Sequence, residues 1–172
     1  MSRPWAGSAF FKMTQDKTSI TLAIRELKEK GVAFALHPYK YEEKGGTEVA
    51  SRELGVDEYM VIKTLVMEDD QGRPFIILMH GNKSVSTKNL ARLRKVKSVK
   101  PCEPEDAHRH TGYLVGGTSP FGTRKPLEVY LEATILDLSR IFINAGKKGL
   151  LAEMSPGDLR KILNPILVNV AI

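Results

Sequence analysis

Cysteine is almost absent from this 172-residue chain, which contains only Cys102. A single thiol cannot form an internal disulfide, and it cannot build a metal cluster from cysteines alone. The chain also lacks any apolar run near the ~20 residues that a membrane-spanning helix requires. These absences exclude a disulfide scaffold and a transmembrane segment, and we expect a cytoplasmic protein that works without a membrane.

Internal repeats, low-complexity tracts and wide linkers are also missing, so a single folded domain is expected. Residues 1–12 show neither helical nor strand periodicity and lack the pattern of a signal peptide. We expect residues 1–15 to form a flexible N-terminal extension and residues 16–172 to form the domain. The net charge of +6 favours an anionic partner such as nucleic acid.

Hydrophobic periodicity and turn residues predict an α+β fold made of short elements. The first expected helix runs from Asp16 or Thr18 to Gly31, with Ile20, Ile24 and Leu27 facing inward. Four more helices are expected: Thr47 to Gly55, Ser86 or Thr87 to Lys95, Pro104 to about His110, and Ser155 to Asn164. Strands are expected over residues 32–36, 59–67, 74–79, 97–100, 127–131, 140–144, 150–153 and 166–170, with a hairpin turn at 69–72. We therefore expect a curved, mixed, mostly antiparallel and barrel-like sheet surrounded by short helices.

Lys63 stands inside the apolar strand segment 61–67. Because side chains alternate along a strand, Lys63 shares its face with Val61 and Leu65. An ammonium in that position either extends to water or meets an anion. It can also act as a gatekeeper that keeps an edge strand from pairing with another chain. The segment alone leaves both interpretations open.

Residues 112–122, GYLVGGTSPFG, form a second informative segment. Adjacent glycines followed by Ser-Pro and another glycine allow backbone N–H groups to converge on one small concavity. Such a nest can hold a phosphate or the oxyanion of a carbonyl under attack, and the alternative is a surface loop with two turns. The segment is not a Walker loop, because no Gly-Lys-Ser/Thr follows it. It is not a dinucleotide-binding pattern either, because it does not link a strand to a helix in the required way.

The remaining candidate groups give weaker signals. His108 and His110 lie on different faces of a helix and have no third ligand, so RNA contact or solvation is favoured over a metal site. His37 and His80 could meet across a sheet, but a structural role explains them better. Cys102 has no obvious base beside it, so a catalytic thiol is not expected. We expect no metal and no cofactor.

Three segments in this order resemble the YbaK family: Lys63-Thr64 in its apolar strand, TGYLVGGTSPFG from Thr111 to Gly122, and NAGKKG from Asn144 to Gly149. Members of that family are freestanding aminoacyl-tRNA deacylases similar to the editing domain of bacterial prolyl-tRNA synthetases. The resemblance covers nearly all of residues 18–163. It implies a hydrolase that acts on the acceptor end of mischarged tRNA, with prolyl-tRNA synthetase as a candidate partner.

The resemblance also implies a role for individual positions. Lys63 would hold the phosphate or ribose side of the terminal adenosine, and the Gly116 N–H would contact the carbonyl of the scissile ester. The implied substrate-binding positions are Tyr39, Thr64, Gly117, Thr118, Ser119, Pro120, Asn144 and Gly146.

The chain departs from the family pattern at three places. Asn144 stands where relatives commonly have serine, and Leu151 replaces an aspartate of some members. The loop between Tyr39 and Thr47 is shorter than in YbaK itself, and this is expected to remove an aromatic from the pocket. Cys-tRNA(Pro) is the expected substrate, with Ser-, Thr- or Ala-tRNA as alternatives. A non-catalytic module that binds the tRNA acceptor end or a synthetase is the competing interpretation.

A dense run of basic residues follows the predicted hairpin: Lys83, Lys88, Arg92, Arg94, Lys95, Lys97 and Lys100. It is either a solvated helix face or a contact for the tRNA backbone. Arg124-Lys125 and Lys147-Lys148 would extend that surface beside the site.

Overall fold

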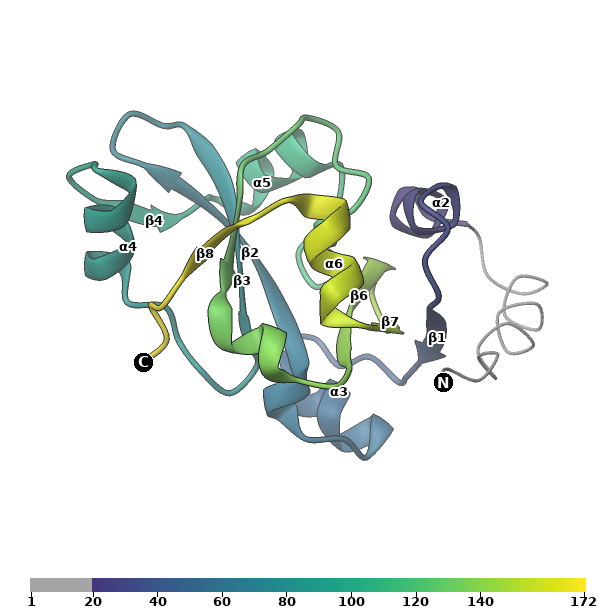
Figure 1. Ribbon diagram of the computed structural model, residues 1–172. Helices are drawn as coiled ribbons and strands as arrows, with labels where there is room; N and C mark the ends of the chain where they lie inside the picture. The colour runs from purple at the N-terminus through teal and green to yellow at the C-terminus, as the bar shows by residue number, and fades with distance from the viewer. Residues whose placement is uncertain (1–19) are drawn as a thin grey trace.

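An eight-stranded mixed sheet forms the centre of the computed structural model, which describes residues 20–172 (Figure 1). The expected N-terminal extension and the capping positions Asp16 and Thr18 lie outside the described residues. The strands are β1 (Ala35–Pro38), β2 (Val61–Asp69), β3 (Pro74–His80), β4 (Val99–Pro101), β5 (Val129–Glu132), β6 (Ile141–Lys147), β7 (Leu150–Met154) and β8 (Ile166–Val168).

The strand order is β1-β7-β6-β2-β3-β5-β8, with β4 pairing to β2 beside this path. The pairs β1–β7, β7–β6, β2–β3 and β2–β4 are antiparallel, whereas β6–β2, β3–β5 and β5–β8 are parallel. The mixed, mostly antiparallel α+β sheet is therefore confirmed. Its barrel-like closure is wrong, because the sheet stays open with β1 and β8 at its two ends.

The described helices are α2 (Leu22–Glu29), α3 (Gly46–Leu54), α4 (Thr87–Arg94), α5 (Pro104–Thr111) and α6 (Pro156–Leu163), with short 3₁₀ turns η1 (Glu58–Met60) and η2 (Ala133–Asp137). No helix within residues 20–172 has the length and apolar character needed to cross a membrane.

Several helix starts confirm the sequence prediction. The Ser86 hydroxyl accepts the Asn89 N–H at 3.2 Å, the Ser155 hydroxyl accepts the Gly157 N–H at 3.1 Å, and Pro104 opens α5. These contacts satisfy N–H groups that have no partner in the first turn of a helix.

The predicted cap of α3 is wrong. The helix begins at Gly46 without a side-chain cap, and the Thr47 hydroxyl donates instead to Glu58 Oε2 at 2.7 Å. The cap of α2 is Thr21, whose hydroxyl accepts the Ile24 N–H at 3.0 Å. Ile20 precedes α2 and is 41 % exposed, so it does not belong to the buried stripe.

The two faces of β2 contact different parts of the core. Ile62 and Val66 pack in the main cluster with residues of α2, α5 and α6. Val61 packs in a small cluster beneath α3, and Met67 packs in a separate cluster with α4. The predicted alternation along this strand is correct, and Lys63 lies between the two clusters on the α3 and α4 side.

Candidate functional site

The candidate site lies at a gap along one edge of β2, between the strands β6 and β4 that pair with its two ends. β6 pairs with Val61 and Ile62, and β4 pairs with residues 67–69. Within residues 20–172, no strand therefore pairs with residues 63–66 on that edge. The Val66 carbonyl accepts the Cys102 N–H at 2.9 Å, which shows that this carbonyl faces the gap. Backbone groups repeat their direction every second residue along a strand, so the N–H and C=O of Thr64 face the same gap.

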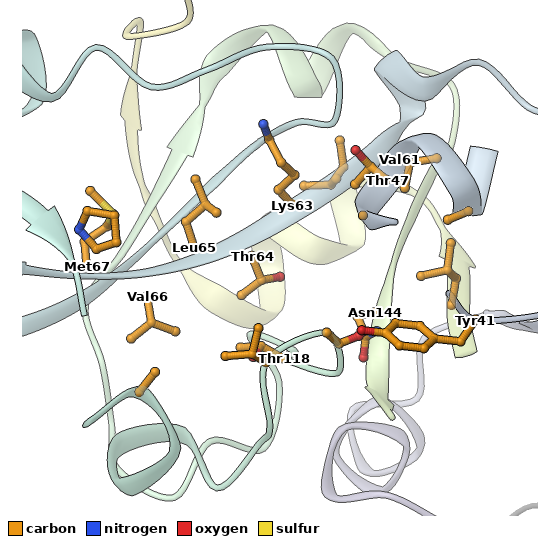
Figure 2. Close-up of a pocket in the computed structure, with 18 of the residues that line it drawn as sticks. Tyr41, Thr47, Val61, Lys63, Thr64, Leu65, Val66, Met67, Thr118 and Asn144 are labelled. Carbon is orange, nitrogen blue, oxygen red and sulfur yellow. The ribbon is translucent and has the colours of Figure 1, made fainter. Parts of the chain in front are cut away.

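A pocket of about 410 Å³ opens at this gap (Figure 2). Its lining is mostly apolar, with a few polar groups among it, as is common for small-molecule sites. The lining residues are Tyr39, Tyr41, Gly46, Thr47, Ala50, residues 61–67, Pro101, Cys102, Ala107, Val115, Gly116, Thr118, Asn144 and Leu151. Figure 2 shows the Lys63 and Thr64 side chains leaving β2 on opposite sides, with Thr64 directed toward the side of Thr118.

Lys63 occupies one side of this pocket with a partly buried side chain. Its Nζ donates a short hydrogen bond to the Lys83 carbonyl oxygen. Burial lowers the pKa of the Lys63 ammonium from its ordinary value, and the Glu58 carboxylate opposes that shift. A partly desolvated ammonium is stabilised by an anion brought close to it, which suits a phosphate-binding role.

Thr64 lies on the other side of the strand and carries an unusual group. Its Oγ1 is buried, and no hydrogen-bond partner for it exists in the described residues. A buried hydroxyl without a partner costs roughly 1–3 kcal/mol. The hydroxyl is therefore available for a polar group that enters this side of the pocket.

The glycine loop supplies a second group without a partner. The Gly116 N–H donates no hydrogen bond to any acceptor within residues 20–172. The Gly117 N–H, by contrast, donates to the Leu114 carbonyl at 2.8 Å. Gly116 has φ of +91°, and a Cβ at that position would overlap the Tyr41 hydroxyl. The positive φ thus favours glycine here, and a Cβ would also displace the end of the Tyr41 side chain.

Asn144 joins this loop to the turn between β6 and β7. Its Nδ2 donates to the Gly116 and Lys147 carbonyls, each at 3.2 Å. Its Oδ1 accepts the N–H groups of Gly146 and Lys147, at 2.6 and 3.1 Å. The amide is fully engaged within the protein, so its observed role is to hold the Gly116 backbone in place.

The short loop after Tyr39 still places an aromatic residue at the pocket, and its loss of an aromatic relative to YbaK stays a prediction. Tyr41, within that loop, lines the pocket and contacts Gly116, and the Lys148 ammonium lies 5.3 Å from its ring centroid. Tyr39 lines the pocket too, and its N–H donates to the Gly149 carbonyl at 2.9 Å.

The structure brings together six of the ten positions implied by the resemblance: Tyr39, Lys63, Thr64, Gly116, Thr118 and Asn144 line the pocket. Gly117, Ser119, Pro120 and Gly146 do not line it. Ser119 is fully buried, and its hydroxyl accepts the Phe121 N–H at 3.2 Å. Gly146 lies against Tyr113, which a Cβ would approach to 2.9 Å.

Sequence reasoning missed Tyr41 and Thr47 as lining residues. Tyr41 stands two places after Tyr39 in the segment that follows β1, and both tyrosines line the pocket. Thr47 follows two glycines at the start of α3. Its place in the pocket depends on the packing of α3 against β2, which no local pattern indicates.

The Cys102 thiol lines the pocket without being activated. Burial, together with the nearby Glu68 carboxylate, raises its pKa to about 12. A thiol with this pKa stays protonated near neutral pH and is a poor nucleophile. The expectation against a catalytic Cys102 therefore agrees with its surroundings.

The histidines lie outside this lining. His37 contacts Glu153 Oε1 at 2.7 Å, whereas His80 stacks on Tyr59 with ring centroids 3.6 Å apart. His108 Nδ1 lies 3.2 Å from the Tyr113 carbonyl, and burial lowers the pKa of His110. Within residues 20–172 no three histidine, cysteine or carboxylate side chains are grouped to hold a metal ion.

The fold and this pocket define a known class of protein. The model of the aminoacyl-tRNA editing domain matches residues 42–162, so this chain belongs to the aminoacyl-tRNA editing domain family.

Two bacterial proteins are similar to this chain in sequence. EbsC of Enterococcus faecalis, a proposed Cys-tRNA(Pro)/Cys-tRNA(Cys) deacylase, is 29 % identical over 154 residues, which cover 89 % of this chain and 92 % of EbsC. YwhH of Bacillus subtilis, an uncharacterized protein, is 24 % identical over 112 residues, covering 65 % of this chain and 71 % of YwhH.

Two solved structures share the fold. The hypothetical protein APE2540 has a TM-score of 0.81 at 22 % identity, covering 88 % of this chain and all of that one. A proposed trans-editing enzyme for prolyl-tRNA synthetase has a TM-score of 0.79 at 19 % identity, covering 90 % of this chain and 99 % of the other.

Proposed function

We propose that this protein hydrolyses the ester of mischarged aminoacyl-tRNA in trans, in the cytoplasm, with Cys-tRNA(Pro) as its preferred substrate. Membership of the editing domain family supports the class of reaction. The proposed activity of EbsC supports the choice of substrate.

The observation that carries the proposal is that Lys63 and Gly116 line the same pocket at the open edge of β2. The terminal adenosine and its phosphate would lie on the Lys63 side. The aminoacyl group would lie on the Thr64 side, with its carbonyl oxygen facing the free Gly116 N–H. An aminoacyl ester is already activated, so orientation and one oxyanion donor contribute much of the catalysis. Loss of one such donor costs about 2.7–4 kcal/mol of transition-state stabilisation in other enzymes.

The nucleophile in this mechanism comes from the substrate. Cys102 lines the pocket as a protonated thiol, with its pKa raised to about 12, and no histidine lines the pocket. The thiol of a cysteinyl ester would attack its own carbonyl carbon. The bond from that carbon to the ribose oxygen then breaks, the thiol proton passes to that oxygen, and a cyclic thiolactone leaves the free tRNA. For Ser-, Thr- or Ala-tRNA, a bound water or the neighbouring ribose hydroxyl would have to attack.

Deacylation of a panel of tRNAs charged with Cys, Ser, Thr, Ala and Pro tests this proposal. We expect hydrolysis of Cys-tRNA(Pro) by the wild type and a loss of roughly 100-fold or more in Lys63→Ala, because one charged contact to the substrate is removed. Lys161→Ala, on the exposed face of α6, is the matched control and should keep full activity.

Each other outcome has a definite meaning. Selective hydrolysis of the Ser, Thr or Ala ester would support the proposed reaction and contradict the choice of Cys-tRNA(Pro) as its substrate. Binding of tRNA without turnover on any ester would identify a non-catalytic module and contradict the proposed enzyme. Equal activity in Lys63→Ala and wild type would show that Lys63 has no role in the reaction.

A further inference from the structure

A stretch of mostly exposed cations begins and ends beside the pocket. We propose that the stretch Lys83–Lys100, which includes α4 and leads into β4, is a binding surface for the phosphate backbone of the tRNA acceptor stem. This inference rests on the proposed function, since it concerns the part of the tRNA that stays outside the pocket.

The charge of the chain is concentrated in this stretch. It contains seven of the 26 lysines and arginines and none of the 20 aspartates and glutamates. The rest of the chain has 19 basic and 20 acidic residues and is close to neutral. The net charge of +6 is therefore a local property of this surface, which is the electrostatic pattern of a nucleic-acid footprint.

One member of the stretch is structural. Arg94 turns inward, donates to Asp69 Oδ2 at 3.3 Å and to Glu128, and lies 4.3 Å from the Phe75 ring centroid. The six others are exposed: Lys83, Lys88, Arg92, Lys95, Lys97 and Lys100. The structure records no salt bridge for these six within residues 20–172. Some exposed cations elsewhere in the same range pair with acids, as Arg52 does with Glu42 at 2.9 Å and Lys148 with Glu43 at 3.0 Å, whereas others, such as Lys161, also have no salt bridge.

Three of the exposed cations border one groove. Lys88 and Arg92 are four residues apart on one face of α4, and Lys97 faces them from the segment before β4. The groove measures about 390 Å³, and the hydroxyl-bearing residues Thr87 and Ser98 also line it. Cations and hydroxyls together are the groups that proteins use to contact phosphate oxygens.

The stretch is continuous with the candidate site. Lys83, its first residue, accepts the hydrogen bond from the Lys63 ammonium through its carbonyl oxygen. Pro101 and Cys102, immediately after its last residue, line the pocket. α4 and β4 lie at the opposite end of the molecule from α2 (Figure 1). An acceptor stem whose terminal adenosine reaches Lys63 would thus pass over α4, where the unpaired cations are.

The test compares Lys88→Ala/Arg92→Ala/Lys97→Ala with a control of equal charge loss, Lys30→Ala/Arg160→Ala/Lys161→Ala. The control residues are exposed, at the C-terminal end of α2 and on α6. Two readouts are needed. One is the affinity for uncharged tRNA(Pro) transcript as a function of salt. The other is kcat/KM for Cys-tRNA(Pro) and for a short cysteinyl ester of the terminal CCA, which fills only the pocket.

We expect the α4 variant to bind tRNA about tenfold more weakly or worse at low salt, with the salt slope of the binding constant reduced by about 2–3. Its kcat/KM should fall on Cys-tRNA(Pro) and stay at the wild-type value on the short ester. The control variant should match the wild type in both readouts.

The inference is overturned by unchanged tRNA affinity and salt slope, or by an equal loss on both esters. Retained tRNA binding with lost binding to prolyl-tRNA synthetase would overturn it as well, because the surface would then serve a protein. If the wild type hydrolyses no ester, the proposed function fails, but the affinity for uncharged tRNA still decides whether this surface binds RNA.

Discussion

Thr64 carries a buried hydroxyl at the pocket. Its Oγ1 has no hydrogen-bond partner within residues 20–172, and its backbone groups face the edge of β2 that β4 and β6 leave open. Buried polar atoms without partners are rare in folded proteins, and they often belong to functional sites. The buried hydroxyl therefore lowers the folding stability, and it leaves a polar group available to a ligand in the pocket.

Replacing Thr64 with valine should separate stability from function. Valine keeps the shape and removes the buried hydroxyl, so we expect the free energy of unfolding to rise by about 1 kcal/mol. Deacylation should fall by roughly tenfold if the hydroxyl meets the substrate, since one hydrogen bond is lost. Urea unfolding and kcat/KM measure the two effects.

Thr118→Val serves as the control for that change, because the Thr118 hydroxyl already donates to the Leu114 carbonyl at 3.3 Å. Its removal should not stabilise the protein. A Thr64→Val protein that is less stable than the wild type would contradict the assignment of an unsatisfied hydroxyl.

At the scale of elements, the site depends on how the glycine loop is held against β6. The Asn144 amide supplies a direct link from the bulged end of β6 to the Gly116 carbonyl. The same amide orders the turn into β7 through Gly146 and Lys147. One side chain thus couples the position of the proposed oxyanion donor to the sheet.

Asn144→Ala should therefore act mainly on the rate of the chemical step. We expect kcat to fall about tenfold or more while KM for the charged tRNA changes little, because the loop shifts but the tRNA contacts remain. Steady-state kinetics on Cys-tRNA(Pro) measure this division. Asn144→Ser should recover part of kcat, since a hydroxyl can replace one of the lost hydrogen bonds.

The exposed Asn169→Ala variant is the matched control and should behave as the wild type. A rise in KM with kcat unchanged would show that Asn144 contacts the substrate and would contradict a positioning role.

At the scale of the whole molecule, a buried histidine links stability to pH. His80 at the end of β3 is 1 % exposed, and its two ring nitrogens lie 2.8 Å from the Tyr59 carbonyl and 2.8 Å from the Thr134 hydroxyl. Burial lowers the pKa of His80 from its ordinary value of 6.5, although the Tyr59 carbonyl and Glu132 oppose the shift. The neutral ring satisfies both contacts, with one nitrogen donating and the other accepting.

The sign of the pH effect follows from that lowered pKa. The unfolded chain binds a proton at His80 more readily than the folded protein, so the stabilisation is complete above pH 6.5 and is lost as the pH falls through the folded pKa. Urea unfolding at pH 8, 7 and 5 should show little change in the free energy of unfolding between the first two values and a decrease at the third.

His80→Gln should be less stable than the wild type near neutral pH and should show a smaller decrease between pH 7 and 5. An undiminished acid loss in this variant would place the titration elsewhere, for example at Asp69. Its pKa is held below the ordinary value because hydrogen bonds from Gln71 and Arg73 outweigh the effect of burial.

Much of the fold was predictable because its signals are local. Ser86 and Ser155 cap helices, Pro104 opens one, and the turn at 69–72 closes the β2–β3 hairpin. The alternation that placed Lys63 apart from Ile62 and Val66 depends only on strand geometry. Strand limits were less accurate: β1 runs over Ala35–Pro38 instead of residues 32–36, because its extent is set by pairing with β7.

The amino-acid sequence by itself thus determined the α+β class, the main elements, the strand lysine and the glycine loop, since each depends on neighbours within a few residues. Only the tertiary structure decided the gap that β6 and β4 leave beside β2, the contact of Tyr41 with Gly116, the role of Asn144 and the inward turn of Arg94. These features join segments far apart in the chain. Their geometry follows from strand order and register, which depend on the packing of the whole core and are not written in any short segment.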